Sequence, residues 1–385
     1  MTTTRELSLL RDGEVRLSRR GLRQALRALG APLVYAFLPA VLLTVMVAAS
    51  IHHHFAFDFH QFWQGGRDVI EGRSPYPPVH SLPAGGDPTL DAVAIQDTFR
   101  FPYPAPAALA MATFGALPFS VAAALFVLLS IAAVFLALRL LGVVDWRCYG
   151  LVFASITTLG AVRLGTFTPF LLLGLAVAWR FREKKLIVAT AVGGLVLLKL
   201  FLWPLLIWLV VSRRVGSAAL AVAIATAISL ASWAVIGFAD LANYPELLST
   251  LASSVESKGW SAVALGLSLG LSSAAAKAFS LVLAASALAV AAVAPRERRD
   301  LWSFTVAIGA AILLSPIVWL HYFLLLVAPL AIAFPALAPA WFIPLALWAW
   351  PFQETGGDIW KIALGMAVLA AACATTLQST RRRPL

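Results

Sequence analysis

The chain has 385 residues, of which 61% are hydrophobic and only 12% are charged, and its mean hydropathy is +0.88. Soluble domains carry about 25% charged residues, so this composition excludes an ordinary soluble protein and indicates a polytopic membrane protein. The formal net charge of +11 does not indicate nucleic-acid binding, because the lysines and arginines are dispersed among short connections and the two ends. That placement is typical of membrane topology and of contact with lipid headgroups.

Apolar segments recur along the whole chain, and each is a candidate membrane-spanning helix. Such a helix needs about 20 apolar residues, and fewer where helices are tilted or broken around an internal cavity. We therefore expect an all-α integral membrane protein, a polytopic bundle of about twelve transmembrane helices. The candidate spans are residues 32–51, 119–141, 148–163, 166–181, 185–200, 201–213, 216–238, 263–294, 301–315, 317–334, 337–351 and 359–379.

A single transmembrane domain, residues 32–379, accounts for nearly all of the chain, because no linker, compositional break or sequence repeat divides it. Residues 1–31 form a basic segment that precedes the first span and lacks a small-residue cleavage motif, which predicts a retained anchor rather than a signal peptide. The tail, residues 380–385, is also basic. We expect both of these ends to be cytoplasmic.

The segment 102–117 is apolar enough to be a further span, but the distribution of positive charge argues against it. If this segment lies at the interface without crossing, the basic clusters all fall on the cytoplasmic side, as the positive-inside rule requires. These clusters are Arg139 with Arg147, RFREKK at 180–185, SRR at 212–214, PRERR at 295–299 and the terminal RRR. The loop 52–101 and the surroundings of 163–166, 199, 239–262 and 315–321 then face outward. Polar residues without a topological role therefore converge on the outer face.

The outer loop opens near Asp58, which is followed by aromatic and apolar residues at helical spacing over 59–71. This pattern predicts an amphipathic interfacial helix, and Gly72 suits the C′ position after it. Asp58 has two interpretations. It is an N-cap of that helix, a position that aspartate favours, or it is a carboxylate at the mouth of a membrane cavity, where partial desolvation raises its basicity.

Histidine and cysteine do not indicate a metal site or a disulfide. Five of the six histidines, residues 52, 53, 54, 60 and 80, lie at or after the first outer boundary, but no cysteine or aspartate at ligand spacing accompanies them. We interpret them as interfacial residues. Cys148 and Cys373 lie in or beside apolar segments far apart in sequence, which is typical of inert membrane thiols. We predict no cofactor, and the sequence leaves a metal requirement open.

Two ionisable residues stand within apolar runs, where such side chains are costly and usually functional. His321 lies in LSPIVWLHYFLLLV, and Lys199 lies in GGLVLLKLFLWPLL. For Lys199 the alternative interpretation is that its side chain snorkels toward the interface from a helix end. Arg163 comes just before a predicted helix start, and helix N-termini and arginines both suit anions. With Asp58, these residues predict an outward-facing cavity that holds one carboxylate and several cations.

A carboxylate beside a cationic phosphate-binding patch suits the transfer of a group from a phospholipid donor. The carboxylate takes the proton of an acceptor hydroxyl, and the cations stabilise the departing phosphate. An ion-coupled transporter can use the same residues, so the chemistry alone leaves both interpretations open.

A set of short motifs follows one another along the chain. They are Asp58 with its aromatic helix and G-R-S-P-Y at 72–76, F-P-Y-P-A-P at 101–106, L-G-T-F-T-P at 164–169, K-L-F-L-W-P at 199–204 and S-P-I-V-W-L-H-Y at 315–322. In this order they resemble glycosyltransferase family 87, over nearly the whole chain. The family comprises integral-membrane mannosyltransferases of the GT-C class, and includes the enzyme of mycobacterial phosphatidylinositol mannoside synthesis.

The resemblance implies an inverting transferase that moves a sugar, usually mannose, from a polyprenyl-phosphate donor to a hydroxyl of a glycolipid or glycan. The expected place is the outer face of a bacterial cytoplasmic membrane, in a GT-C-like bundle surrounded by membrane lipids. The resemblance implies that Asp58 is the general base and that Lys199 and His321 lie near the donor phosphate or the acceptor. It assigns Tyr76 and Tyr103 to the loop over the site.

Two further arginines lie near these motifs, and one residue differs from the family pattern. Arg67 or Arg73 is a candidate for phosphate contact, although a solvated loop arginine is the simpler interpretation of each. The sequence has Thr166 where the family often has glutamine, which leaves the sugar or acceptor contacts at that turn open. A nucleotide sugar is not expected, because the sequence shows no phosphate-cradling Gly-rich loop and no Asp-x-Asp pair.

Three alternatives remain at this point. A related enzyme transfers arabinofuranose or another pentose, and the sequence does not separate the sugars. A flippase or transporter of lipid-linked sugars predicts gating residues on both faces and preferably an internal repeat, whereas the polar residues here gather on one face. A purely structural scaffold does not need Lys199 and His321 in apolar segments.

Overall fold

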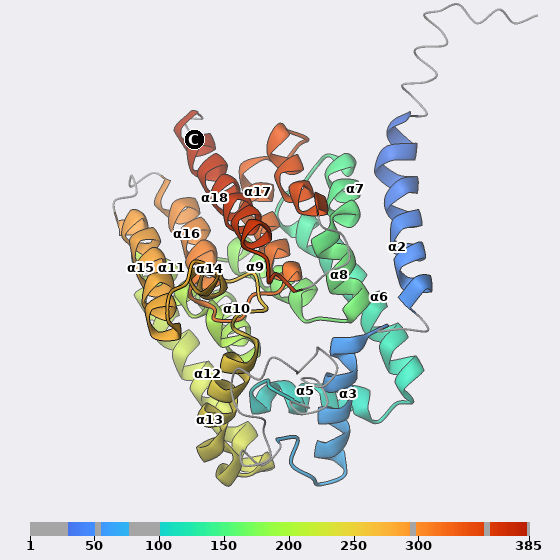
Figure 1. Cartoon of the computed structure of the whole chain (residues 1–385), viewed down its shortest axis with the longest axis vertical. Coiled ribbons are helices and arrows are strands. Elements are labelled where there is room, and N and C mark those ends of the chain that lie inside the picture. Colours follow the sequence, from blue (N-terminus) through green and yellow to red (C-terminus); the bar gives the residue numbers. More distant parts are fainter. Residues whose placement is uncertain (1–29, 51–54, 77–100, 293–297, 350–354, 383–385) are drawn as a thin grey trace, which may run out of the picture.

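A computed structural model describes residues 30–50, 55–76, 101–292, 298–349 and 355–382. All regular structure within these residues is helical (Figure 1). The helices that span or border the bundle are η1 (Leu33–Phe37), α2 (Leu38–Ser50), α6 (Phe119–Leu140), α7 (Trp146–Ala154), α8 (Ile156–Leu164), α9 (Thr168–Arg180), α10 (Lys185–Leu198), η3 (Leu200–Leu202), α11 (Pro204–Val211), α12 (Val215–Ile236), α14 (Ala262–Ser268), α15 (Ser273–Ala292), α16 (Arg299–Leu314), η5 (Leu320–Leu326), α17 (Val327–Ala333), η6 (Pro339–Ala349) and α18 (Ile359–Arg382). The expected basic ends, 1–31 and 380–385, lie largely outside the described residues.

Five helices of the described part are long and apolar enough to cross a membrane, or six if the bent pair α8 and α9 is one broken span. They begin at Gly30, Phe119, Val215, Ser273 and Ile359. The other expected spans are shorter or broken, so the number of about twelve crossings stays a prediction. For example, the segment 263–294 is divided between α14 and α15, and 337–351 contains a 3-10 helix.

The breaks in these helices have local causes. Ser155 ends α7 and caps α8, because its Oγ accepts a hydrogen bond from the backbone N–H of Thr158. Gly165 follows α8 with a φ of +68°, a left-handed conformation that favours glycine, and α9 then leaves at 116° to α8. The chain therefore turns sharply at residues 165–167.

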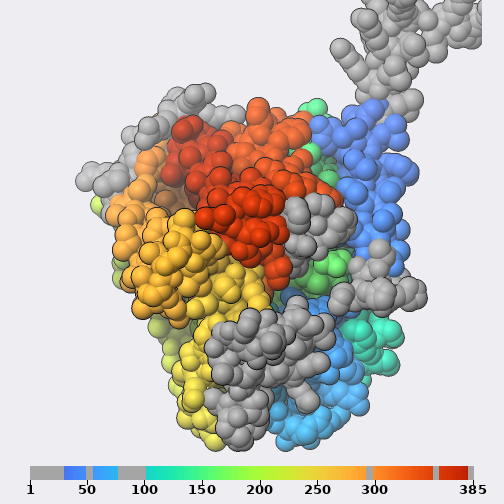
Figure 2. Space-filling view, viewed as in Figure 1, coloured from blue at the N-terminus to red at the C-terminus, as the bar shows by residue number. Residues whose placement is uncertain are grey.

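Three helices form a layer at one end of the bundle, which we call the cap: α3 (Phe57–Ile70), α5 (Ala105–Gly115) and α13 (Phe238–Val255). They lie at the end opposite the C-terminus in Figure 1, and Figure 2 shows α3 in light blue and α13 in yellow below the orange and red C-terminal helices. With 11 residues, α5 is about 16 Å long, too short to cross a hydrocarbon core of about 30 Å. The expectation that 102–117 does not cross stays a prediction, because other expected spans are as short.

Glycines allow the backbones of α3 and α5 to touch. A Cβ at Gly66 would collide with the backbone of Met111, and a Cβ at Gly115 would collide with the backbone of Arg67. Around this contact, aromatic side chains of α3, α6 and α13 make a hydrophobic core separate from that of the main bundle. The cap therefore packs on the neighbouring ends of α6 and α12 through this second core.

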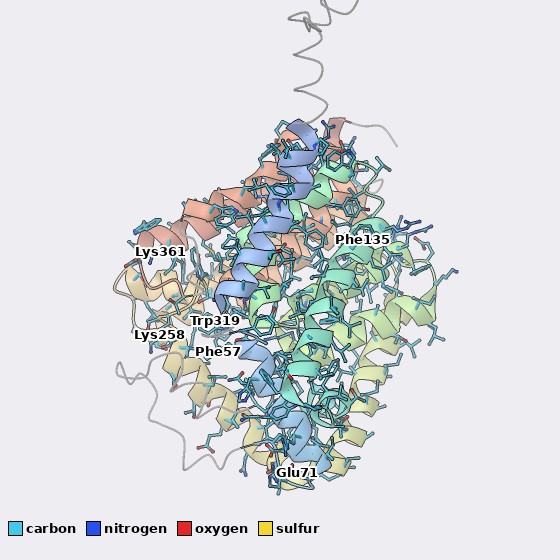
Figure 3. The ribbon with its side chains drawn as sticks, turned by 90° about the vertical axis from the view of Figure 1, so that its right-hand side faces the viewer. Phe57, Glu71, Phe135, Lys258, Trp319 and Lys361 are labelled. Atoms are coloured by element: carbon cyan, nitrogen blue, oxygen red, sulfur yellow. The ribbon has the colours of Figure 1, made fainter. Side chains whose placement is uncertain are left out.

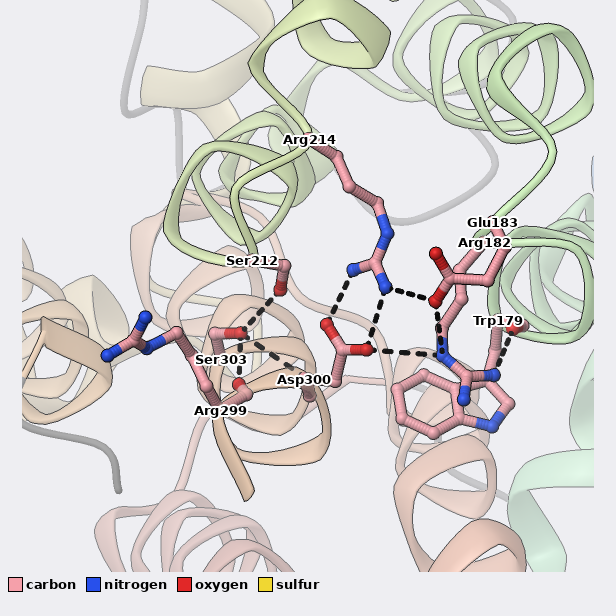
Figure 4. Close-up of polar contacts among 8 residues, drawn as sticks. All are labelled: Trp179, Arg182, Glu183, Ser212, Arg214, Arg299, Asp300 and Ser303. Carbon is pink, nitrogen blue, oxygen red and sulfur yellow. Dashed lines mark hydrogen bonds and ion pairs between the residues drawn. The ribbon is translucent and has the colours of Figure 1, made fainter. Parts of the chain in front are cut away.

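The opposite end of the bundle is held by a charged network (Figure 4). Arg214 donates to both oxygens of Asp300, at 2.5 and 2.8 Å, and to Glu183 at 2.5 Å. Arg182 donates to Asp300 at 3.2 Å and stacks over Trp179. The network joins the α9–α10 and α11–α12 connections to the start of α16, so Arg214 is a partly buried structural residue as well as part of a basic cluster.

Candidate functional site

Asp58 is the second residue of α3, which begins two residues earlier than the sequence predicts. The prediction that Asp58 is the N-cap is wrong, because that position belongs to Ala56, in a left-handed conformation with a φ of 51°. The helix start is set by tertiary contact instead: the N–H of Ala56 donates to the carbonyl of Arg163 at 2.8 Å. The carboxylate is partly buried, and the cap role does not compete for it.

The turn between α8 and α9 holds the first turn of α3 in place. A Cβ at Gly165 would lie 2.6 Å from the Cβ of Phe59, so the two backbones approach closely. Phe62 stacks on Phe167 of the same turn with ring centroids 4.2 Å apart. Figure 3 shows Phe57, at the start of α3, at the level of Trp319 of the bundle, while Glu71 lies at the far end of the cap. Asp58 therefore lies at the seam between cap and bundle.

Lys199 reaches this seam from the bundle. It ends α10 in an extended conformation, with φ −146° and ψ 102°, and its side chain is partly buried. The ammonium donates to the hydroxyl of Tyr103 at 3.0 Å and to the hydroxyl of Tyr322 at 2.7 Å. It also lies 4.1 Å from the ring centroid of Tyr103, within the range of a cation–π interaction. Lys199 is thus held by polar groups and does not snorkel away from the protein.

The charge of Asp58 interacts with this group. Phe62, one turn farther along α3, packs edge-on against Tyr103 with ring centroids 4.8 Å apart, and this packing brings the Asp58 carboxylate within electrostatic range of Lys199 and the two phenols. Opposite charges that share a partly buried site attract more strongly than they would in water. The structure therefore brings together Asp58 and Lys199 with two phenols, which come from the cap, the bundle and the 101–104 segment. We call these four residues the seam cluster.

His321 lies beside the cluster. It is 3% exposed, in the 3-10 helix η5, and its ring packs edge-on against Tyr322 with centroids 4.9 Å apart. This position agrees with the expectation that His321 belongs near the site. A role in binding or catalysis stays a prediction.

Arg163 enters the site region from the last turn of α8. Its backbone carbonyl is the partner of Ala56, and its side chain is partly buried. Among the residues that the structure describes, its buried Nε has no hydrogen-bond partner. An unpartnered buried donor is costly, which makes this Nε a candidate to bind an anion. Thr166, in the next turn, accepts from the N–H of Thr168 at 3.2 Å and thereby starts α9.

Tyr76 supports the site indirectly, through Tyr103. Its hydroxyl donates to the backbone carbonyl of Tyr103 at 2.9 Å, and its ring stacks on Trp233. Burial raises the pKa of the Tyr76 phenol above its ordinary value, so the group stays a neutral hydrogen-bond donor. The expected role over the site is therefore indirect: Tyr76 fixes the segment that carries Tyr103.

Arg67 lies away from the seam cluster. Nine residues separate it from Asp58 on one helix, which places it about 13 Å farther along the axis. It is exposed, pairs with Glu71 at 2.7 Å and covers the ring of Trp63. Arg73 pairs with Asp68 at 2.6 Å and with Glu71. Both arginines fit the simpler interpretation, that of solvated residues at the end of the cap.

Metal ligands do not gather in the described part of the chain, where no group of three or more His, Cys, Asp or Glu residues could hold an ion. The histidines at 52, 53, 54 and 80 lie outside the described residues. Cys148 and Cys373 are free thiols on α7 and α18.

Tyr322 is the member of the cluster that sequence reasoning missed. It follows His321 directly, and its ring stacks on Phe201 with centroids 5.1 Å apart and an angle of 11° between the planes. A tyrosine in an apolar run is an ordinary membrane residue, so Tyr322 carried no signal of its own. The partner Lys199, a cation in an apolar run that needs acceptors, was the available signal.

Comparison of the sequence with protein-family models shows to which family the chain belongs. The model of glycosyltransferase family 87 matches residues 101–316, more than half of the chain. The chain belongs to glycosyltransferase family 87. Together with the apolar helices, this membership identifies a membrane glycosyltransferase. No curated protein and no solved structure matches the chain.

The family 87 match covers part of the seam cluster. Tyr103 and Lys199 lie within residues 101–316, as does the neighbouring Arg163, whereas Asp58 precedes the matched region and Tyr322 follows it. The family is therefore established by the central helices. The roles of Asp58 and of the 315–322 motif depend on the geometry of this chain.

Proposed function

We propose that the protein transfers a sugar, in the first instance mannose, from a polyprenyl-phosphate donor to a hydroxyl of a glycolipid or glycan. The observation that carries this proposal is the seam cluster, in which a carboxylate and an ammonium from different layers share one partly buried site. Asp58 is then the general base, and Lys199 with Arg163 holds the phosphate. The acceptor and the donor reach the site from the surrounding lipid.

The reaction balances with these groups alone. The acceptor oxygen attacks the anomeric carbon from the face opposite the phosphate, and its proton passes to Asp58. The bond between the anomeric carbon and the phosphate oxygen breaks, so the configuration inverts and a polyprenyl monophosphate leaves. A phosphodiester with one negative charge becomes a monoester with nearly two near neutral pH. Cations that act on this additional charge lower the barrier.

The topology that fits this chemistry is a GT-C-like bundle of about twelve crossings, in which the shorter and broken helices cross together with the long ones. The positive-inside rule then places the network around Arg214 in the cytoplasm, and the cap, with α3 lying in the interface, outside. The membrane would be the cytoplasmic membrane of a bacterium. A cysteine-labelling scan that found position 68 accessible only from the cytoplasm would reverse this orientation.

The test of the function is sugar transfer by purified protein in lipid bilayers, with radiolabelled polyprenyl-phosphate-mannose and membrane-lipid acceptors. Wild type should form labelled glycolipid, and Asp58→Asn should be at least about 100-fold slower, the usual contribution of a general base. Asp68→Asn is the matched control, because it removes a carboxylate that lies on the same helix and pairs with Arg73. Equal transfer by wild type and Asp58→Asn would remove Asp58 from the mechanism.

The same assay separates the alternatives. Label transferred only from a polyprenyl-phosphate pentose would identify a pentosyltransferase. Movement of the lipid-linked sugar across the bilayer without product would indicate a flippase and would overturn the proposal.

A further inference from the structure

The Phe101–Pro104 segment is held in an unusual way. Pro102 and Pro104 have no backbone N–H and cannot donate hydrogen bonds. The segment is held through its carbonyls, because two tyrosine hydroxyls donate to consecutive ones. Tyr244 donates to the carbonyl of Pro102 at 3.0 Å, and Tyr76 donates to that of Tyr103 at 2.9 Å. This double contact fixes the backbone from which the Tyr103 side chain projects, on the side of the cap.

Tyr322 is fixed equally well on the side of the bundle. Its side chain is buried, stacks on Phe201 and meets the ring of His321 edge-on. The two hydroxyls that accept from Lys199 are therefore mounted on rigid supports in different parts of the fold. In the sequence, Tyr103 lies 96 residues from Lys199, and Tyr322 lies 123 residues from it.

The consequence concerns the freedom of the ammonium. A lysine side chain has several rotatable bonds and loses about 2 kcal/mol of conformational entropy when it is immobilised. Here two of its three N–H donors are already committed to phenol oxygens. Each phenol oxygen accepts from Lys199. The ammonium therefore keeps its third N–H for an anion, and the two phenols fix the position from which that N–H is offered.

We propose that Tyr103 and Tyr322 are positioning residues that hold Lys199 for the phosphate that leaves the lipid-linked donor. This inference rests on the proposed function, and it assigns the phosphate to Lys199, whose ammonium is held by two tyrosines from separate segments. Because the leaving phosphate gains negative charge during the reaction, donors fixed in advance stabilise the transition state and the product more than the bound donor. Loss of one hydroxyl should therefore lower kcat more than it raises KM.

Tyr322→Phe tests this inference without disturbing the packing, because phenylalanine keeps the ring that stacks on Phe201. We expect kcat to fall about 10-fold, the effect of losing one hydrogen bond to a charged group, with KM within about twofold of wild type. Tyr103→Phe should behave in the same way. Tyr149→Phe is the matched control, since it removes a hydroxyl that donates to a backbone carbonyl at 3.2 Å elsewhere, and it should leave both constants unchanged.

A double-variant cycle distinguishes positioning from an independent role. If Tyr322 acts through Lys199, then Tyr322→Phe should have no further effect in a Lys199→Met background. Losses that multiply would overturn the proposal. Unchanged kinetics in both single variants would overturn it as well.

A binding measurement keeps the inference separate from the fate of the transfer reaction. Wild type should bind farnesyl monophosphate in detergent, Tyr322→Phe should bind it about 10-fold more weakly, and both should bind farnesol equally. If wild type fails to transfer sugar but shows this pattern, the phosphate site stands and the proposed reaction falls. If transfer occurs but Tyr322→Phe binds the phosphate as wild type does, the inference is wrong and the reaction stands.

Discussion

Replacement of Gly165 by alanine tests how the fold positions Asp58. The residue has a φ of +68°, and an alanine held in this conformation costs about 1–2 kcal/mol. Its Cβ would also lie 2.6 Å from the Cβ of Phe59, whereas carbon atoms in contact prefer 3.5–4.0 Å. Residue 59 must therefore move by about 1 Å, and Asp58 is its neighbour on the first turn of α3.

The chain provides a control for the backbone strain alone. Gly142 has a φ of +86°, and a Cβ there would meet nothing within 4 Å. Gly142→Ala should therefore cost about 1–2 kcal/mol of stability and leave sugar transfer per folded molecule unchanged. Gly165→Ala should cost about 1–3 kcal/mol more, as overpacking does. It should also reduce kcat about 10- to 100-fold, because a displacement of about 1 Å is costly to a catalytic group.

The measurements are thermal unfolding in detergent and transfer by the folded fraction, made side by side for both variants. If Gly165→Ala matched Gly142→Ala in stability and in transfer, the turn between α8 and α9 would not set the position of α3. A loss of stability with full transfer would show that the position of Asp58 does not depend on this contact.

Two further predictions concern residues away from the site. Arg214→Met should lower the free energy of unfolding by about 2 kcal/mol, because it leaves a partly buried carboxylate of Asp300 with fewer partners. Arg73→Met, which removes an exposed ion pair, should cost less than about 1 kcal/mol; comparable melting shifts for the two variants in detergent would contradict this account of the network. Hydrogen bonds from the side chain of Arg147, and from two backbone N–H groups, lower the pKa of Asp145 to about 2. The resulting stabilisation is complete above the ordinary carboxyl pKa of about 4 and disappears as the pH falls toward 2. Asp145→Asn should therefore flatten the acid side of the plot of unfolding free energy against pH. An unchanged plot would refute the assignment.

The sequence predicted those features that depend on local chemistry. The helix predicted over 59–71 is confirmed as a helix at Phe57–Ile70, and Gly72 is confirmed at its C′ position, because amphipathic spacing and a positive φ are local properties. Lys199 and His321 stood out because a charged or ionisable side chain in an apolar run has few explanations. Both of these residues lie at or beside the seam cluster.

Features that depend on tertiary contact were beyond such reasoning. Aspartate is a good N-cap, so Asp58 was a reasonable candidate for that position, but Ala56, whose N–H donates to the carbonyl of Arg163, is the N-cap instead. The basic residue Arg214 was interpreted from the distribution of charge alone. Its contact with Asp300 joins segments 86 residues apart, and no periodicity or composition indicates such a pair.

The seam cluster combines residues of the cap with residues of the bundle, and this has a kinetic consequence. Asp58 belongs to the cap, and its position depends on the contact between Gly165 and Phe59. The site for the leaving phosphate depends on Lys199 and Tyr322 of the bundle. Gly165→Ala should therefore slow transfer while its affinity for farnesyl monophosphate stays within about twofold of wild type, whereas Tyr322→Phe should lose about tenfold of that affinity. Equal losses of phosphate affinity in the two variants would mean that cap and bundle move together, and that base and phosphate cannot be assigned to separate layers.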